Sequence, residues 1–105
     1  MGGRQRVEKS NLIITYMKIA FDVDGTLVKG DVPRYEVINL LISLRKLTGS
    51  EIYVWSGGGV SYAEMWVRKL GLSSYVEGVI AKGSEEVDIA VDDMDAYLGK
   101  VTLRV

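Results

Sequence analysis

Short apolar runs alternate with longer segments of helical periodicity along most of the chain. The runs at 18–23, 51–55, 76–80, 87–91 and 101–105 are rich in β-branched and aromatic residues, and polar or glycine-rich turns separate them from the segments between. Each run has the length of a buried strand rather than that of a helix. The pattern therefore predicts five strands.

Two segments between these runs carry apolar residues at three- and four-residue spacing, which predicts helices. The first spans 31–48, with Asp31 as its N-cap, Pro33 in its first turn and Gly49 as its C-terminal stop. The second spans 60–70 and follows a run of three glycines. We expect both helices to connect parallel strands.

This alternation indicates βαβ units, and hence a mostly parallel sheet with helices on both faces. We therefore expect an α/β fold, a Rossmann-like three-layer α/β/α arrangement around a five-stranded sheet. We assign residues 17–105 to this single core. Residues 1–16 form a basic N-terminal extension whose order the sequence leaves open.

The composition narrows the chemistry that such a domain can perform. The chain has 105 residues, of which 48% are apolar and 26% charged, as in ordinary globular domains. It contains no cysteine and no histidine, which excludes thiolate nucleophiles, Ser-His-Asp triads and zinc sites built on these residues. Catalysis at neutral pH would have to use carboxylates, lysine, hydroxyls or a hard metal ion.

The charge balance gives weaker indications about partners. The formal net charge is −1, but the first sixteen residues carry +2, so the remaining residues carry −3. This balance disfavours a polynucleotide partner, although four basic residues can form a local patch: Arg34, Arg45, Arg68 and Lys69. No apolar run approaches the roughly 18–20 residues of a membrane span. We expect a cytoplasmic protein without a membrane partner.

Polar residues directly after apolar strands are the places to look for a site, because ligands of parallel sheets bind at the carboxyl ends of strands. The first strand ends in Asp22 and Asp24, followed by Gly25 and Thr26. Two carboxylates beside a buried strand suit a nucleophile that also binds metal, Asp22, and a general acid and base, Asp24. The alternative is an Asp-Gly turn with capping side chains.

Three further strand ends carry candidate groups. Ser56 and Gly57 open a strand-to-helix turn that can bind phosphate, although a flexible turn would look the same. Lys82 follows the third strand as a fixed cation, or simply as a solvated lysine. Asp92 and Asp93 follow the fourth strand, and their carboxylates suit Mg²⁺. The alternative is that they stabilise the N-terminus of a helix by their negative charge, a role that fits Asp95 better than metal binding does.

These motifs, in this order, resemble the haloacid dehalogenase superfamily of aspartate-nucleophile phosphohydrolases. The resemblance covers residues 17–105. It rests on FDVDGTLV at 21–28, VWSGG at 54–58, Lys82 and VDD at 91–93. The first of these motifs is highly specific, and the others support it.

The resemblance implies a phosphomonoester hydrolase with an aspartyl-phosphate intermediate. Asp22 would attack phosphorus, and Asp24 would protonate the leaving oxygen and then activate water. Lys82 would be the third catalytic group. The phosphate-binding residues would be Ser56, Gly57, Thr26 and Lys82, with Thr26 also supporting the turn that carries Asp24. The cofactor would be Mg²⁺, held by Asp22, the main-chain carbonyl of Asp24, Asp92 and Asp93.

Most members of this family carry an inserted cap domain, and this chain has no room for one. About eight residues separate Thr26 from the first helix, and the segment after Gly71 is equally short. We expect a capless, open site for a small phosphorylated molecule or an exposed macromolecular phosphate such as a nucleic-acid 3′-phosphate end. Alternatively, a neighbouring subunit in a homo-oligomer covers the open site.

Two other function classes stay open. One is a catalytically quiet domain that binds a phosphate or a partner and has kept the fold. The other is a receiver-like signalling domain, which also places acids, a hydroxyl and a lysine at strand ends. The order of the motifs in this chain disfavours the receiver.

Overall fold

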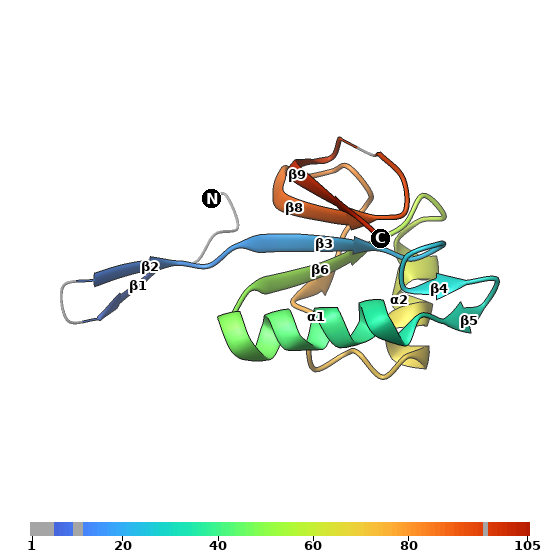
Figure 1. Ribbon diagram of the computed structural model, residues 1–105, viewed down its shortest axis with the longest axis horizontal. Helices are drawn as coiled ribbons and strands as arrows, with labels where there is room; N and C mark the ends of the chain where they lie inside the picture. Colours follow the sequence, from blue (N-terminus) through green and yellow to red (C-terminus); the bar gives the residue numbers. More distant parts are fainter. Residues whose placement is uncertain (1–5, 10–11, 96) are drawn as a thin grey trace.

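A five-stranded parallel sheet forms the centre of the molecule (Figure 1). The structure, a computed structural model, describes residues 6–9, 12–95 and 97–105. The sheet order is β7-β6-β3-β8-β9, and the strands are β3 (Lys18–Asp22), β6 (Glu51–Trp55), β7 (Gly78–Val79), β8 (Val87–Asp92) and β9 (Gly99–Arg104). All five predicted strands are confirmed, although the third keeps only two residues of its expected five.

Helices α1 (Tyr35–Thr48) and α2 (Val60–Lys69) lie on the same face of the sheet (Figure 1). Alternate residues of β3, Ile19 and Phe21, share one buried cluster with residues of both helices, among them Leu41 and Trp66. The topology explains this placement. The chain moves outward from β3 to β6 to β7. Because crossovers between parallel strands are nearly always right-handed, two crossovers in the same direction put both helices on one side.

Loops instead of helices cover the opposite face. Ala20 and Trp55 point to this side, where Ile80 and Leu98 pack against them from the connections before and after β8. No helix among the described residues lies on this face, so the prediction of helices on both faces is wrong. The reason is that residues 80–86 and the described part of 93–98 return to the next parallel strand without helical turns.

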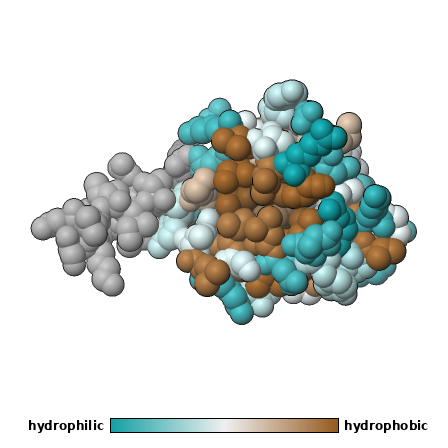
Figure 2. Space-filling model, in the orientation of Figure 1, coloured by the Kyte–Doolittle hydropathy of each residue, from teal (hydrophilic) through white to brown (hydrophobic). Residues whose placement is uncertain are grey.

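Part of the helix-bearing face also stays open at strand β9. Val101 and Leu103 lie on that face, and they are 59% and 42% exposed. Figure 2 shows apolar residues gathered in the middle of this side of the molecule, where α1 runs below the edge of the sheet. The two helices cover the half of the sheet around β3 and β6 and leave β9 uncovered.

Helix α1 begins four residues later than the periodicity predicts. A small hairpin, β4 (Val28–Lys29) and β5 (Val32–Pro33), occupies the expected first turn. Asp31 has a φ of 61° in the hairpin turn, so it is not the N-cap, a position that Arg34 takes. The predicted C-terminal stop is confirmed, since Gly49 has a φ of 67° and donates its N–H to Arg45.

A second hairpin precedes the core. Strands β1 (Arg6–Lys9) and β2 (Leu12–Thr15) pair antiparallel and extend away from the sheet (Figure 1). They belong to the segment expected as a basic extension, of which residues 1–5 and 10–11 lie outside the described part. Within the described residues, neither helix has the length and apolar character needed to cross a membrane.

Candidate functional site

The parallel register brings three of the predicted strand ends side by side. Asp22 of β3 pairs with Trp55 of β6, so Ser56 follows at the neighbouring strand end. Phe21 pairs with Val91 of β8, which puts Asp92 next to Asp22 on the other side. Because side chains alternate between faces, Asp22 and Asp92 both point to the face without helices. Residues more than thirty positions apart in sequence thus meet at one edge of the sheet.

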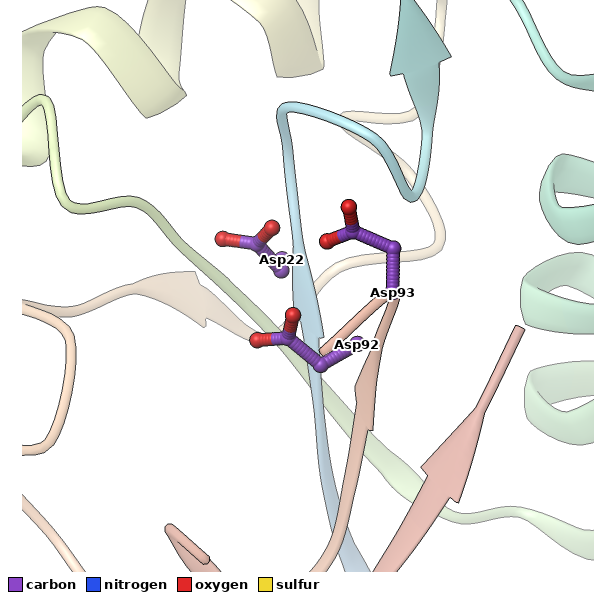
Figure 3. A group of neighbouring side chains, drawn as sticks. All are labelled: Asp22, Asp92 and Asp93. Carbon is purple, nitrogen blue, oxygen red and sulfur yellow. The ribbon is translucent and has the colours of Figure 1, made fainter. Parts of the chain in front are cut away.

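Three carboxylates crowd this edge (Figure 3). One oxygen from each of Asp22, Asp92 and Asp93 lies within 4.8 Å of the others. Asp22 and Asp92 are buried, and Asp93 is half-buried. Burial raises the pKa of the Asp22 carboxyl, and the charges of Asp92 and Asp93 raise it further, while the hydrogen bond from Lys82 opposes the change. The cluster therefore favours a cation among its oxygens.

Lys82 supplies one such cation from the loop after β7. Its Nζ lies 3.0 Å from Asp22 Oδ1 and 3.0 Å from Asp92 Oδ2. Burial alone would lower the pKa of this ammonium group, but the two carboxylates outweigh burial and raise it, so Lys82 stays charged. The loop reaches these acids because it crosses the helix-free face on its way from β7 to β8. The reading of Lys82 as a merely solvated lysine is wrong.

The donor set also fits a hard metal ion. Asp92 Oδ1 accepts the backbone N–H of Met94 at 3.0 Å. Its Oδ2 is buried and receives no well-aligned hydrogen bond from the described residues, although the Lys82 ammonium is nearby. Three neighbouring carboxylates, two of them buried, are ligands of the kind that Mg²⁺ accepts. Asp95 lies apart from this set, exposed and paired with Arg104, and no helix begins after Asp93 within the described residues.

Asp24 and Thr26 lie in a tight turn at the end of β3. The backbone N–H groups of Thr26, Leu27 and Val28 all point to the carbonyl of Val23, at 2.9–3.1 Å. Thr26 is fully buried, and its hydroxyl lies 3.5 Å from Asp22 Oδ2, a long hydrogen bond at most. Thr26 is thus buried beneath the turn with its hydroxyl directed to Asp22, whereas Asp24 is exposed.

Gly25 makes this turn possible and touches the acidic cluster. Its φ is 82°, and a Cβ at this position would lie 2.1 Å from Asp93 Oδ2. We expect Gly25→Ala to cost about 1–2 kcal/mol in the free energy of unfolding, from the left-handed backbone. Because the Asp93 carboxylate must also rotate away, we expect about tenfold weaker Mg²⁺ binding, a typical result of disturbing a metal ligand.

Gly30→Ala is the matched control for this variant. Gly30 has a φ of 56°, but a Cβ there would meet no atom within 4 Å. Urea unfolding should show a similar loss of stability for both variants. Mg²⁺ titration followed by thermal melting should show weaker binding only for Gly25→Ala. Equal binding by both variants would contradict a role for Asp93 as a metal ligand.

The turn after β6 offers hydrogen-bond donors beside Asp22. Ser56 is buried, and its Oγ accepts the N–H of Gly58 at 3.0 Å, which leaves its hydroxyl hydrogen available to a ligand. Gly57 is exposed, with open space above its Cα. Helix α2 begins at Val60, directly after this turn, so its positive N-terminal end lies next to the turn.

Two further side chains contact the turn that carries Asp24, and the sequence reasoning missed this role for both. Tyr62 of α2 donates its hydroxyl to Asp24 Oδ1 at 2.8 Å. Arg34 donates from Nη1 to the carbonyl oxygen of Gly25 at 2.7 Å and so holds the Asp24–Gly25 turn from outside. The three-glycine run before Tyr62 was the available signal, because it lets a helix begin immediately beside the strand end.

A cavity of about 630 Å³ opens beside Asp93. It lies between the β4–β5 hairpin, the start of α1 and the end of the described chain. Its lining residues are Gly25, Lys29, Val32, Pro33, Arg34, Glu36, Asp93 and Val105. It shares Gly25, Arg34 and Asp93 with the groups described above, and Asp93 is the one member of the acidic cluster in its lining, so the cluster forms its rim.

Comparisons with protein-family models, with curated proteins and with solved structures give no match for this chain. The geometry of the strand-end groups is therefore the basis for assigning a function.

Proposed function

We propose that this protein is a Mg²⁺-dependent phosphomonoester hydrolase of the haloacid dehalogenase type, with an aspartyl-phosphate intermediate on Asp22. The observation that carries the proposal is the position of Lys82 Nζ, 3.0 Å from both Asp22 and Asp92 at the edge where Asp93 also lies. An ordinary solvent-exposed turn does not require a buried nucleophile candidate, a fixed cation and two further acids in contact. Phosphoryl transfer requires this combination of positioning and charge neutralisation.

Asp22 acts first in this scheme. One of its oxygens attacks phosphorus, the bond from phosphorus to the leaving oxygen breaks, and Asp24 gives its proton to that oxygen. Lys82 fixes the orientation of the Asp22 carboxylate and balances charge on the phosphoryl oxygens. The hydroxyl of Ser56 and the N–H of Gly57 bind those oxygens.

Asp24 acts again in the second half of the reaction. Its carboxylate takes a proton from water as the water oxygen attacks phosphorus, and the bond between phosphorus and Asp22 breaks to release phosphate. An exposed side chain suits both tasks, because Asp24 must meet a leaving group and then a water molecule from solvent.

Asp22, Asp92, Asp93 and the carbonyl of Asp24 would hold Mg²⁺. When bound, the ion supplies additional positive charge for the phosphoryl oxygens and relieves the repulsion among the acids.

The surroundings of the site support an accessible phosphate as substrate. Residues 27–34 form only the β4–β5 hairpin and its flanks, so no inserted domain covers Asp24. The cavity beside Asp93 offers space for the rest of a small molecule or for the end of a larger one. No observation favours a nucleic-acid end over a small phosphorylated metabolite.

Hydrolysis of p-nitrophenyl phosphate tests this function. We expect turnover with millimolar Mg²⁺. Chelation with EDTA should lower the rate of hydrolysis by at least about 100-fold, because the acids would repel the phosphoryl group without the ion. Added Mg²⁺ should restore the rate. Hydrolysis that is indifferent to EDTA would contradict the metal assignment. The absence of hydrolysis, with Mg²⁺ and beryllofluoride still bound, would favour the catalytically quiet domain.

A further inference from the structure

Tyr62 links two loops of the site that lie far apart in the sequence. It is the third residue of α2, and its hydroxyl donates to Asp24 Oδ1 at 2.8 Å across a separation of 38 residues. No hydrogen bond from the described residues reaches Asp24 Oδ2. One oxygen of this exposed carboxylate is thus held, and the other is free to exchange a proton.

The ring of Tyr62 is positioned as well as its hydroxyl. A Cβ at Gly58 would lie 3.0 Å from Cδ2 and 3.3 Å from Cγ of Tyr62, so the ring packs directly against the Gly58 backbone. Gly58 in turn donates its N–H to Ser56 Oγ. One aromatic side chain therefore touches both the turn after β6 and the turn after β3.

We propose that Tyr62 is a positioning residue that holds Asp24 in the orientation from which it protonates the leaving oxygen. The inference rests on the proposed phosphohydrolase function and assigns a role that no strand-end motif carries. An exposed aspartate on a turn samples several rotamers, and fixing Oδ1 selects those in which Oδ2 faces the substrate. In the step concerned, the bond from phosphorus to the leaving oxygen breaks, its electron pair stays on that oxygen, and the Asp24 proton joins it.

This role predicts a dependence on the leaving group. A p-nitrophenolate ion leaves readily without a proton, whereas an alkoxide does not. Loss of Asp24 positioning should therefore slow phosphoryl transfer from an alkyl phosphate much more than from p-nitrophenyl phosphate. The value of kcat/KM reports this first step, because it excludes the later hydrolysis of the aspartyl-phosphate.

The experiment compares kcat/KM of wild type and Tyr62→Phe on p-nitrophenyl phosphate and on glycerol 2-phosphate, with saturating Mg²⁺. General acid catalysis contributes about 10²–10⁴-fold to a rate. We therefore expect Tyr62→Phe to lower kcat/KM by about tenfold on glycerol 2-phosphate and by less than about twofold on p-nitrophenyl phosphate. Tyr62→Phe keeps the ring against Gly58, so the fold should be preserved. Tyr75→Phe, a tyrosine beyond the far end of α2, is the matched control and should change neither value.

A double-mutant cycle completes the test. In the Asp24→Asn background, the rates at which the two substrates phosphorylate Asp22 are compared, and Tyr62→Phe should have no further effect on their ratio, because the group that it positions is gone. An equal loss on both substrates, or no loss on either, would overturn the positioning role while leaving the phosphohydrolase intact. A wild-type protein that hydrolyses neither substrate would overturn the proposed function and this inference together.

Discussion

Asp22→Asn should lower the rate of phosphate-ester hydrolysis by about 10⁴-fold or more, because an uncharged amide cannot form the aspartyl-phosphate. The same change should leave the fold intact. Burial and the charges of Asp92 and Asp93 disfavour the ionised Asp22 carboxylate, so a neutral side chain of the same shape should keep or slightly raise the free energy of unfolding without metal.

Steady-state kinetics and urea unfolding of the same preparations check both parts. Asp95→Asn is the matched control, since Asp95 is exposed and paired with Arg104, and it should retain wild-type activity. Substantial hydrolysis by folded Asp22→Asn would remove Asp22 as the nucleophile. A collapse of stability would mean that Asp22 is chiefly a structural residue.

Lys82→Ala should affect activity and stability together. Without the ammonium group, Asp22 and Asp92 stay buried at the sheet edge with no cation beside them. Removing one partner of a buried ion pair is strongly destabilising, and with Lys82 partly exposed we expect a loss of about 1–3 kcal/mol in metal-free buffer. We also expect activity to fall by about 10²–10³-fold, the usual effect of removing a group that stabilises transition-state charge.

Added Mg²⁺ should recover part of that stability, because the ion supplies positive charge to the same carboxylates. A ligand present at one hundred times its Kd adds about 2.7 kcal/mol. Thermal melts with and without Mg²⁺ measure this recovery. Lys46→Ala, on the exposed surface of α1, should lose less than about 1 kcal/mol and show no special response to the metal. A Lys82→Ala protein as stable and as active as wild type would contradict the assigned role.

The strand-end groups could be predicted because they depend on local patterns. Asp22, Ser56 and Asp92 each follow an apolar run, and the parallel register then brings them to one edge. Lys82 could be identified only by its place in the order of motifs. Its contact with Asp22 depends on the path of the loop over the helix-free face, which no local pattern specifies.

The errors in the predicted fold have equally specific causes. Asp31 and Pro33 are good residues for a helix start, but Gly30 and Asp31 both adopt positive φ and form a hairpin turn instead. The expectation of helices on both faces followed from strand–helix alternation. It failed because the connection from β7 to β8, where the direction across the sheet reverses, contains no helix.

The helical periodicity could not have predicted the contact of Tyr62 with Asp24. On the periodicity of α2 it lies one turn before Trp66, where an aromatic residue is expected to pack in the core. Only the placement of the helix start beside the β3 turn brings its hydroxyl to Asp24, 38 residues away.

The aspartyl-phosphate itself gives the most direct test of the central claim. Wild type and Asp24→Asn are mixed with p-nitrophenyl phosphate and Mg²⁺, quenched in acid, and examined by intact-mass and peptide mass spectrometry. The proposed mechanism predicts one added phosphoryl group on Asp22, which hydroxylamine should remove. This group should accumulate in Asp24→Asn, because that variant cannot activate water. It should be absent from Asp22→Asn treated in the same way. Turnover by wild type with no phosphoryl group on Asp22 in either protein, or with the group on another residue, would contradict the mechanism.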